Sequence, residues 1–354
     1  MFWSVAAFFA LTLQPSLNLQ LPSPKKTDVK KLESQYLKNI KQVTSGFMRA
    51  GEGYFSPNGK WIIYQAEMRG VNNPFYQIFM QKLATPPQLK RVSTGAGKCT
   101  CSYFHPNGKK IIFASSHLDP DVVKHYKVEY EARAEAKKIG KRRRYVWDFD
   151  PYMEIFEADL DGKKLKRLTN SKGYDAEGAY SADGKQIVFC SNRSGKENLE
   201  LYIMNSDGTN VRQLTDAPKC YNGGPFFSPD GKRVIFRSDR EKKDHLQLYV
   251  INSDGTGEKA LTDNLNWVYW APYWYKDSKH IVYTAANHAV PGRPNYDLYW
   301  MNIETGKTVR LTHDPAADVL PVFSPDGTKL MWTSRRTPSR TSQLFIADFT
   351  PPEE

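Results

Sequence analysis

The stretch FSPDGKRVIFRSD, residues 227–239, is a complete β-hairpin signal. It begins on an aromatic residue, and Ser228-Pro229-Asp230-Gly231 follows as a turn in which proline presets φ and glycine takes the positive-φ position. The apolar run VIF at residues 234–236 then indicates a buried strand. The stretch therefore predicts two antiparallel strands joined by a tight turn.

The same unit occurs five more times, as FSPNGKWIIYQA, FHPNGKKIIFAS, YSADGKQIVFCS, WYKDSKHIVYTA and FSPDGTKLMWTS. These copies begin at Phe55, Phe104, Tyr180, Trp274 and Phe323, so successive copies are 49, 76, 47, 47 and 49 residues apart. A period near 48 is the length of one four-stranded propeller blade. The one long interval, between the second and third copies, indicates an insertion of about 28 residues.

A second signature follows each copy. An apolar strand such as LELYIMN leads to a turn such as SDGT and then to a strand ending in Leu-Thr. Each blade is therefore expected to contain four strands in sequence order. The sequence predicts an all-β fold, a six-bladed β-propeller over residues 35–350.

The two ends of the repeat region complete each other. The segment KNIKQVT, residues 38–44, has the spacing of a Leu-Thr strand without a blade before it, while the last copy stops after its third strand at Phe349. We expect the N-terminal segment to be the outer strand of the sixth blade, which would close the ring and cover a free sheet edge.

The repeat FSPDGK, LYxMNxDG, RLT resembles that of the TolB-like six-bladed β-propellers, which is shared with prolyl-oligopeptidase-type propellers and with oligogalacturonate lyase. The resemblance covers roughly residues 35–350 and implies an envelope protein that binds partners through its propeller. The TolB family carries an α/β domain before the propeller, and we expect that domain to be lacking here. One fold hosts many functions, so the repeat is more specific for fold than for activity.

The N-terminal residues indicate export. The apolar run MFWSVAAFFALTL is too short to span a bilayer and lies where a signal peptide has its apolar core. We predict a signal peptide at residues 1–20, a linker at 21–34 rich in Pro and Lys, a periplasmic or secreted location, and no transmembrane segment in the mature chain. A monomer is expected.

The insertion falls at residues 118–148, between the second and third strands of the second blade. An Asp-Pro pair and apolar residues at four-residue spacing, from Val122 to Ala134, predict a helix of about 20 residues. The basic run KRRR and the aromatic residues Tyr145, Trp147 and Phe149 follow. They fit a helical lid pinned by its aromatics or a lid that binds a partner; a nucleic-acid patch is the third alternative, but an exported protein seldom meets nucleic acid, so none is expected as a partner.

Motifs for catalysis and metal binding are absent from the sequence. It contains no GxSxG, HExxH, P-loop or EF-hand spacing. The spacing of the four cysteines fits neither a zinc site nor a disulfide scaffold; Cys190 is expected to be a packed thiol, and a bridge involving Cys220 stays open. We therefore predict no catalytic residue, metal ligand or cofactor.

The formal charge of +12 predicts a basic surface. Such a surface is either simply solvated or attracted to an anionic envelope surface or an acidic partner. Together with the missing catalytic motifs, the resemblance to TolB-like propellers implies a non-catalytic module that binds an envelope protein or a cell-wall polymer.

The binding face is expected where the loops after the Leu-Thr strands and the loops between second and third strands emerge together. Carboxylates and amides near the axis and cationic groups at the rim make this the most polar concave surface that the repeats can build. Arginines at this position could equally clamp a carboxylate structurally. The candidate residues are Glu52, Asp175, Glu177, Asn222, Asp318, Arg193, Arg240, Arg336, His117 and His288. His117 and His288 also support the alternative function, a metal-assisted polysaccharide lyase of the oligogalacturonate lyase type, although two ligands are few.

Overall fold

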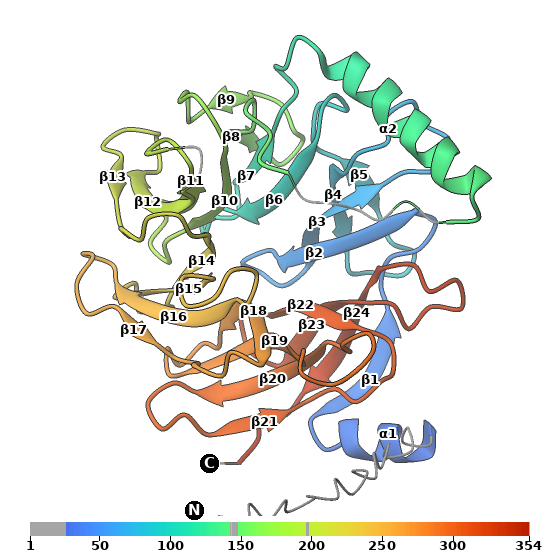
Figure 1. The fold of residues 1–354 in the computed structure, drawn as a ribbon, viewed down its shortest axis with the longest axis vertical. Helices are drawn as coiled ribbons and strands as arrows, with labels where there is room; N and C mark the ends of the chain where they lie inside the picture. Colours follow the sequence, from blue (N-terminus) through green and yellow to red (C-terminus); the bar gives the residue numbers. More distant parts are fainter. Residues whose placement is uncertain (1–25, 142, 144–147, 196–197, 354) are drawn as a thin grey trace, which may run out of the picture.

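The computed structural model describes residues 26–141, 143, 148–195 and 198–353. Six antiparallel four-stranded sheets are arranged as blades around a central axis (Figure 1). The predicted six-bladed β-propeller is confirmed. The strands of blades 1 to 3 are β2 (Arg49–Phe55), β3 (Trp61–Glu67), β4 (Gln77–Lys82), β5 (Leu89–Arg91), β6 (Cys99–Phe104), β7 (Lys110–Ser115), β8 (Glu154–Asp159), β9 (Lys166–Arg167), β10 (Asp175–Tyr180), β11 (Gln186–Ser191), β12 (Glu200–Asn205) and β13 (Arg212–Gln213).

Blades 4 to 6 follow the same order, from the innermost strand outward. Their strands are β14 (Asn222–Phe227), β15 (Arg233–Ser238), β16 (Gln247–Asn252), β17 (Lys259–Ala260), β18 (Trp267–Trp274), β19 (His280–Asn287), β20 (Asp297–Asn302), β21 (Thr308–Arg310), β22 (Asp318–Phe323), β23 (Lys329–Ser334), β24 (Gln343–Phe349) and β1 (Leu37–Gln42).

The second strand of each blade lies at the centre of the core. In β15 the side chains of Val234, Ile235 and Phe236 are completely buried, because sheets of neighbouring blades cover both faces of the strand. The turn before it has the predicted conformation: Gly231 has φ +73°, which glycine adopts without steric strain because it has no Cβ. The repeated motif is thus a hairpin whose second strand fills the space between blades.

The recurrent Leu-Thr has a structural role. In every blade a Thr or Ser hydroxyl just after the fourth strand accepts a hydrogen bond of 2.8–3.0 Å from a backbone N–H near the start of the third strand. The six hydroxyls belong to Thr44, Ser93, Thr169, Thr215, Thr262 and Thr312. Because a buried N–H without a partner is costly, this bond continues the sheet pairing beyond the end of the short outer strand.

The N-terminal segment closes the ring as predicted. β1 pairs antiparallel with β24, with Leu37 opposite Phe349 and Gln42 opposite Phe345. Thr44 donates to Gln343 and accepts from the Leu344 backbone N–H at 2.8 Å, which is the Leu-Thr contact of the other blades. The first and last strands of the ring therefore lie in one sheet.

Each innermost strand bulges at the same position. Pairing between the first and second strands shifts at the residue three before the motif aromatic, and this residue has φ between 49° and 59° in all six blades. The six residues are Glu52, Cys101, Glu177, Gly224, Ala271 and Leu320. A bulge bends a strand and turns a side chain out of the regular alternation, so each blade directs this residue toward the axis.

Within the described ranges, two helices lie outside the blades. α1 (Lys26–Glu33) packs below β1, within the segment predicted only as a linker, and α2 (Val122–Lys138) lies along blade 1 (Figure 1). The insertion is confirmed as helical and lies between β7 and β8. The predicted signal peptide and the residues Tyr145 and Trp147 lie outside the described residues.

α2 is attached by polar contacts. None of its side chains is buried, but Tyr126 accepts the Gly97 backbone N–H at 2.7 Å, and Arg133 pairs with the buried Glu67 at 2.6 Å. Its tyrosines therefore bond to blade 1 and to the loop leading to blade 2. Of the aromatics predicted to pin the lid, Phe149 is described, and its ring lies 5.3 Å from that of Tyr174 and 6.4 Å from that of Tyr221.

All four cysteines are buried as free thiols, so Cys190 is a packed thiol as predicted and Cys220 forms no bridge. In the part of the chain that the structure describes, no helix is long and apolar enough to cross a membrane.

Candidate functional site

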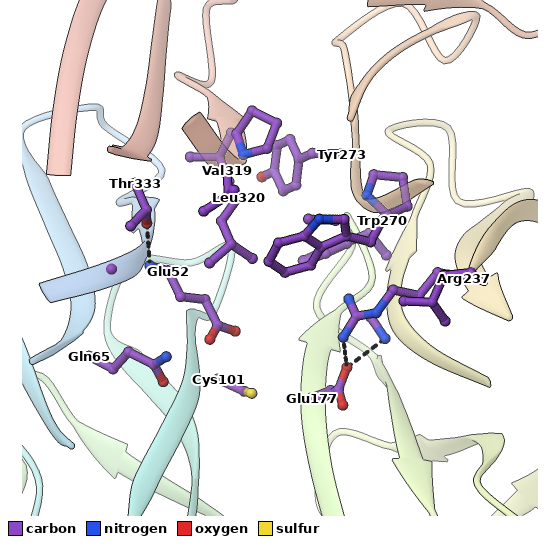
Figure 2. A pocket seen from close by; sticks show the side chains of 18 of the residues that line it. Glu52, Gln65, Cys101, Glu177, Arg237, Trp270, Tyr273, Val319, Leu320 and Thr333 are labelled. Atoms are coloured by element: carbon purple, nitrogen blue, oxygen red, sulfur yellow. Dashed lines mark hydrogen bonds and ion pairs between the residues drawn. The ribbon is translucent and has the colours of Figure 1, made fainter. Parts of the chain in front are cut away.

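A cavity of about 680 Å³ occupies the central channel of the ring, and all six bulge residues line it. Its wall also includes residues of the loops between second and third strands, namely Phe149, Lys243, Asp244, Leu246 and Ser342. The cavity therefore opens on the loop-bearing face. Figure 2 shows Glu52, Glu177, Arg237 and Trp270 directed into it from different blades.

Four aromatic rings meet at the axis, and three of them, those of Tyr54, Phe226 and Tyr273, line this channel cavity. Tyr54 and Phe226, from the opposite blades 1 and 4, lie with ring centroids 5.7 Å apart, and the hydroxyls of Tyr103 and Tyr273, from the opposite blades 2 and 5, are 3.1 Å apart. Side chains that touch across the axis fill the channel at that level. The cavity is therefore a pocket with one mouth.

Glu177 on β10 holds blade 3 to blade 4. Its carboxylate accepts hydrogen bonds from the Gly224 backbone N–H at 2.6 Å, from Arg237 at 3.0 Å and from Tyr221 at 3.1 and 3.2 Å. Only 8% of the Glu177 side-chain surface and 15% of that of Arg237 is exposed. A carboxylate with this many donors is fully engaged in structure.

Gly224 makes room for this ion pair. A Cβ at this position would collide with the Arg237 guanidinium, so a side chain cannot replace glycine without displacing the arginine. The nearby carboxylate and phenol raise the pKa of Arg237 above its usual range, despite the opposing effect of burial. Arg237 also lies over the ring of Trp270, with the guanidinium carbon 5.9 Å from the ring centroid.

Glu52 on β2 occupies the same position in blade 1 but has a different environment. The Thr333 hydroxyl accepts its backbone N–H at 3.0 Å, whereas its carboxylate receives a long bond of 3.5 Å from Tyr54 and a weak one from the Cys101 thiol. Burial, together with the charge of Glu177, raises the pKa of Glu52 to about 7. Glu52 is thus a carboxylate with most of its acceptor capacity unused.

The remaining carboxylates and arginines of the predicted site lie behind the cavity wall. Arg193 bonds both oxygens of the buried Asp175 at 2.9 and 3.0 Å. Arg336 bonds the buried Asp318 and also Glu33 of α1. These are the structural clamps that the sequence left open as an alternative.

The clamp of blade 4 uses an amide. Arg240 bonds the buried Asn222 at 2.9 Å and the carboxylate of Glu258. None of the six clamp residues lines the channel cavity; they are Asp175, Asn222, Asp318, Arg193, Arg240 and Arg336. A role for them in binding stays a prediction.

The two histidines of the predicted site lie in different environments. His117 contacts Ser115 at 2.9 Å and the ring of Phe156 within blade 2, and burial lowers its pKa. His288 contacts Tyr296 at 2.8 Å and lines a second cavity beside α1. Among the described residues, no group of three or more His, Cys, Asp or Glu side chains is arranged to hold a metal ion.

Arg237, Trp270 and Phe149 line the channel cavity but were not predicted. Arg237 stands ten residues after the motif aromatic, where blades 1 and 6 have the cavity-lining residues Gln65 and Thr333. A comparison of this position across the six copies would have shown a single charged residue.

No family model matches the chain. An uncharacterised protein of Agrobacterium fabrum is 32% identical over 78 residues, which is 22% of this chain and 26% of that protein, so the chain matches about a quarter of its length.

Three solved structures show the same arrangement at low identity. A protein assigned as TolB from Agrobacterium tumefaciens is 20% identical with a TM-score of 0.56, covering 85% of this chain and 91% of that one. TolB from Acinetobacter baumannii is 20% identical with a TM-score of 0.53, covering 88% of this chain and 66% of that one. An oligogalacturonate lyase from Vibrio parahaemolyticus is 13% identical with a TM-score of 0.53, covering 87% and 93%.

Likeness at this level of identity establishes a fold and leaves activity and partners open. The repeat motifs, the closed ring of six blades and these similarities agree that the chain has a six-bladed β-propeller fold like that of the TolB structures.

Proposed function

We propose that the chain is an exported, non-catalytic propeller that binds an envelope protein or a cell-wall component through its loop-bearing face. The observation that carries this proposal is the channel cavity, a concave pocket that opens on that face and combines aromatic walls with a few convergent polar groups. Pockets of this kind are where ligands usually bind. The resemblance to TolB-like propellers supports an envelope partner.

The lyase alternative receives no comparable support. His117 and His288 belong to blades 2 and 5, which are opposite in the ring. His117 contacts Ser115, whereas His288 contacts Tyr296 and the ring of His245 from blade 4. Metal analysis of the purified protein tests this alternative, since a stoichiometric transition metal would favour it.

Capture from an envelope extract onto immobilised protein tests the binding function. Phe149→Ala removes a half-exposed ring at the cavity mouth, and the matched control Trp61→Ala removes an aromatic ring that follows a turn on the opposite face. We expect a partner to be retained by the parent and the control and lost with Phe149→Ala. Equal retention by all three proteins, or loss with the control alone, would contradict the proposed face.

A further inference from the structure

The channel cavity is acidic although the protein is basic. Among the described residues, four carboxylates and two cationic side chains line it, while the whole chain carries a formal charge of +12. The carboxylates are those of Glu52, Glu177, Asp239 and Asp244, and the cations are Arg237 and Lys243. A ligand that enters must therefore meet a local charge opposite to that of the surrounding surface.

Both cations of the cavity already have partners within it. Arg237 pairs with Glu177 at 3.0 Å, and Lys243 pairs with Asp239 at 3.1 Å. The two charges of each ion pair cancel. The charge available to a ligand is therefore that of Glu52 inside the cavity and of Asp244 at its mouth. Glu52 is the deeper of the two, because it belongs to an innermost strand rather than to a loop.

The position of Glu52 is fixed by the backbone. Its φ of 49° and the bond from its N–H to Thr333 hold the bulge, and the side chain extends into the cavity on the side opposite Trp270 (Figure 2). A non-glycine residue in this conformation costs free energy and is found where the surrounding structure or a function requires it. The bulge therefore presents a preorganised carboxylate.

The walls suit an organic cation. Trp270, Tyr76 and Phe149 provide aromatic rings, and a cation beside an aromatic ring is stabilised more strongly when it leaves water. Arg237 already lies over the ring of Trp270 and Arg49 over that of Tyr76, so two of these walls hold a cation of the protein itself and the ring of Phe149 is half-exposed. The pocket has one mouth and about 680 Å³, which is enough for an extended side chain but not for a folded domain. An alkylammonium or guanidinium group on a flexible stem fits this shape and charge.

We infer that the channel cavity binds a lysine or arginine side chain of a partner protein, with Glu52 as its counter-ion. The inference rests on the proposed partner-binding function of the loop-bearing face and specifies which chemical group the partner presents. Because the protein surface is basic, a cationic group is held only where the local charge is reversed, which makes the cavity selective.

A short peptide probe tests this inference. The probe is acetyl-Gly-Lys-Gly amide, and its Nε-acetyl-lysine form is the uncharged control. Calorimetry at pH 8 compares the parent protein with Glu52→Gln and with Glu304→Gln, a matched change in an exposed turn of blade 5. We expect Glu52→Gln and acetylation of the probe each to weaken binding by about tenfold or more, and Glu304→Gln to leave it unchanged.

The parent protein offers a second measurement that does not depend on folding of a variant. Since the probe requires the ionised carboxylate and the pKa of Glu52 is raised to about 7, affinity should fall by about tenfold per pH unit below pH 7. The groups that face Glu52 are Tyr54, Tyr76, Cys101, Glu177 and Arg237, and burial raises the pKa of Tyr76 to about 12. Burial raises the pKa values of Tyr54 and Cys101 far above this range, so neither ionises in the experiment.

Three results would overturn the inference: no binding of the probe, equal binding to the parent and to Glu52→Gln, or equal affinity of the parent for the charged and the acetylated probe. Failure of the proposed function would give a different combination of capture and probe-binding results. If capture from the envelope extract still depends on Phe149 while the probe does not bind, only the lysine or arginine inference is wrong. If the probe binds as expected and no partner is captured, the proposed function is wrong.

Discussion

Glu52 and Glu177 occupy the same position of the repeat in blades 1 and 3, with φ of 49° and 56°, and both line the channel cavity. Their carboxylates nevertheless have different partners. Glu177 accepts bonds from a backbone N–H, an arginine and a tyrosine of blade 4, whereas Glu52 receives a long bond from Tyr54 and a weak one from the Cys101 thiol of blade 2. Glu177 therefore joins blades 3 and 4, whereas the carboxylate of Glu52 remains available to a ligand.

The next blade along the ring causes this difference. Blade 4 supplies Tyr221, Gly224 and Arg237, which together surround Glu177. The same three positions of blade 2 hold Lys98, Cys101 and Ala114. Lys98 pairs with Asp148 and Asp150 of the insertion, and Ala114 has no polar group. The repeat position thus determines the backbone conformation of each glutamate, and the residues of the next blade determine which hydrogen bonds its carboxylate accepts.

The largest expected effect is that of Glu177→Ala. It leaves the largely buried Arg237 without its carboxylate and Gly224 without an acceptor, so the free energy of unfolding should fall by about 3–5 kcal/mol. Urea unfolding of Glu177→Ala and Glu52→Ala measures the contrast. Equal losses in the two variants would show that the glutamates are equivalent and that the distinction is wrong.

Removing Arg237 tests the same comparison through the ion-pair partner of Glu177. Arg237→Met keeps much of the apolar stem over Trp270 but leaves Glu177 without its charge partner, and we expect a loss of about 2–4 kcal/mol. The double variant Arg237→Met with Glu177→Gln should recover part of this loss, because no buried charge is then unpaired. A double variant whose loss equals the sum of the single losses would exclude coupling of the pair.

Glu52→Gln should stabilise the protein, with an effect that depends on pH. The folded-state pKa of about 7 lies above the unfolded value, so the folded parent binds more protons between pH 4.5 and 7 and loses stability as the pH rises through this window. The amide that replaces the carboxyl does not titrate. After allowance for partial exposure, the variant should exceed the parent by about 1–3 kcal/mol above pH 7 and match it below pH 4.5. An advantage that is the same at pH 4 and pH 8 would contradict the raised pKa.

The smallest expected effect concerns the bond that fixes the Glu52 bulge. Thr333→Val removes the acceptor of the Glu52 N–H and should cost about 1 kcal/mol. Thr284→Val removes the equivalent acceptor of the Leu320 N–H, at 3.1 Å between blades 5 and 6, and serves as the matched control for stability. Only Thr333→Val should also weaken binding of the lysine probe. Equal probe affinity in the two variants would show that the bulge does not position Glu52.

The sequence predicted the architecture because each blade repeats its own local signals. The turn residues, the buried second strand and the Leu-Thr contact recur in register, and Thr44 with the unpaired third strand at Phe349 indicated the closure of the ring. The periodicity also identified Glu52 and Glu177 as equivalent positions near the axis. These features depend on neighbours within one blade.

The partners across blades could not be predicted in the same way. The ion pair of Glu177 with Arg237 joins residues that are 60 positions apart, and nothing local distinguishes it from the clamps of Arg193 with Asp175 and Arg336 with Asp318. The clamps are turned away from the channel, although their residue types resemble a binding site. Helix α1 was missed because its position depends on the contact of Glu33 with Arg336 rather than on a strong helical pattern.

The measurement that tests the central claim most directly is the titration of the Glu52 carboxyl by NMR of protein labelled with ¹³C at glutamate Cδ, assigned by the signal lost in Glu52→Gln. A carboxylate that is half-buried and available to a ligand should titrate with a pKa of about 7, and saturating lysine probe should lower this value because the bound cation favours the ionised form. A pKa near the ordinary value of 4.5, or a raised pKa that the probe does not change, would contradict the account.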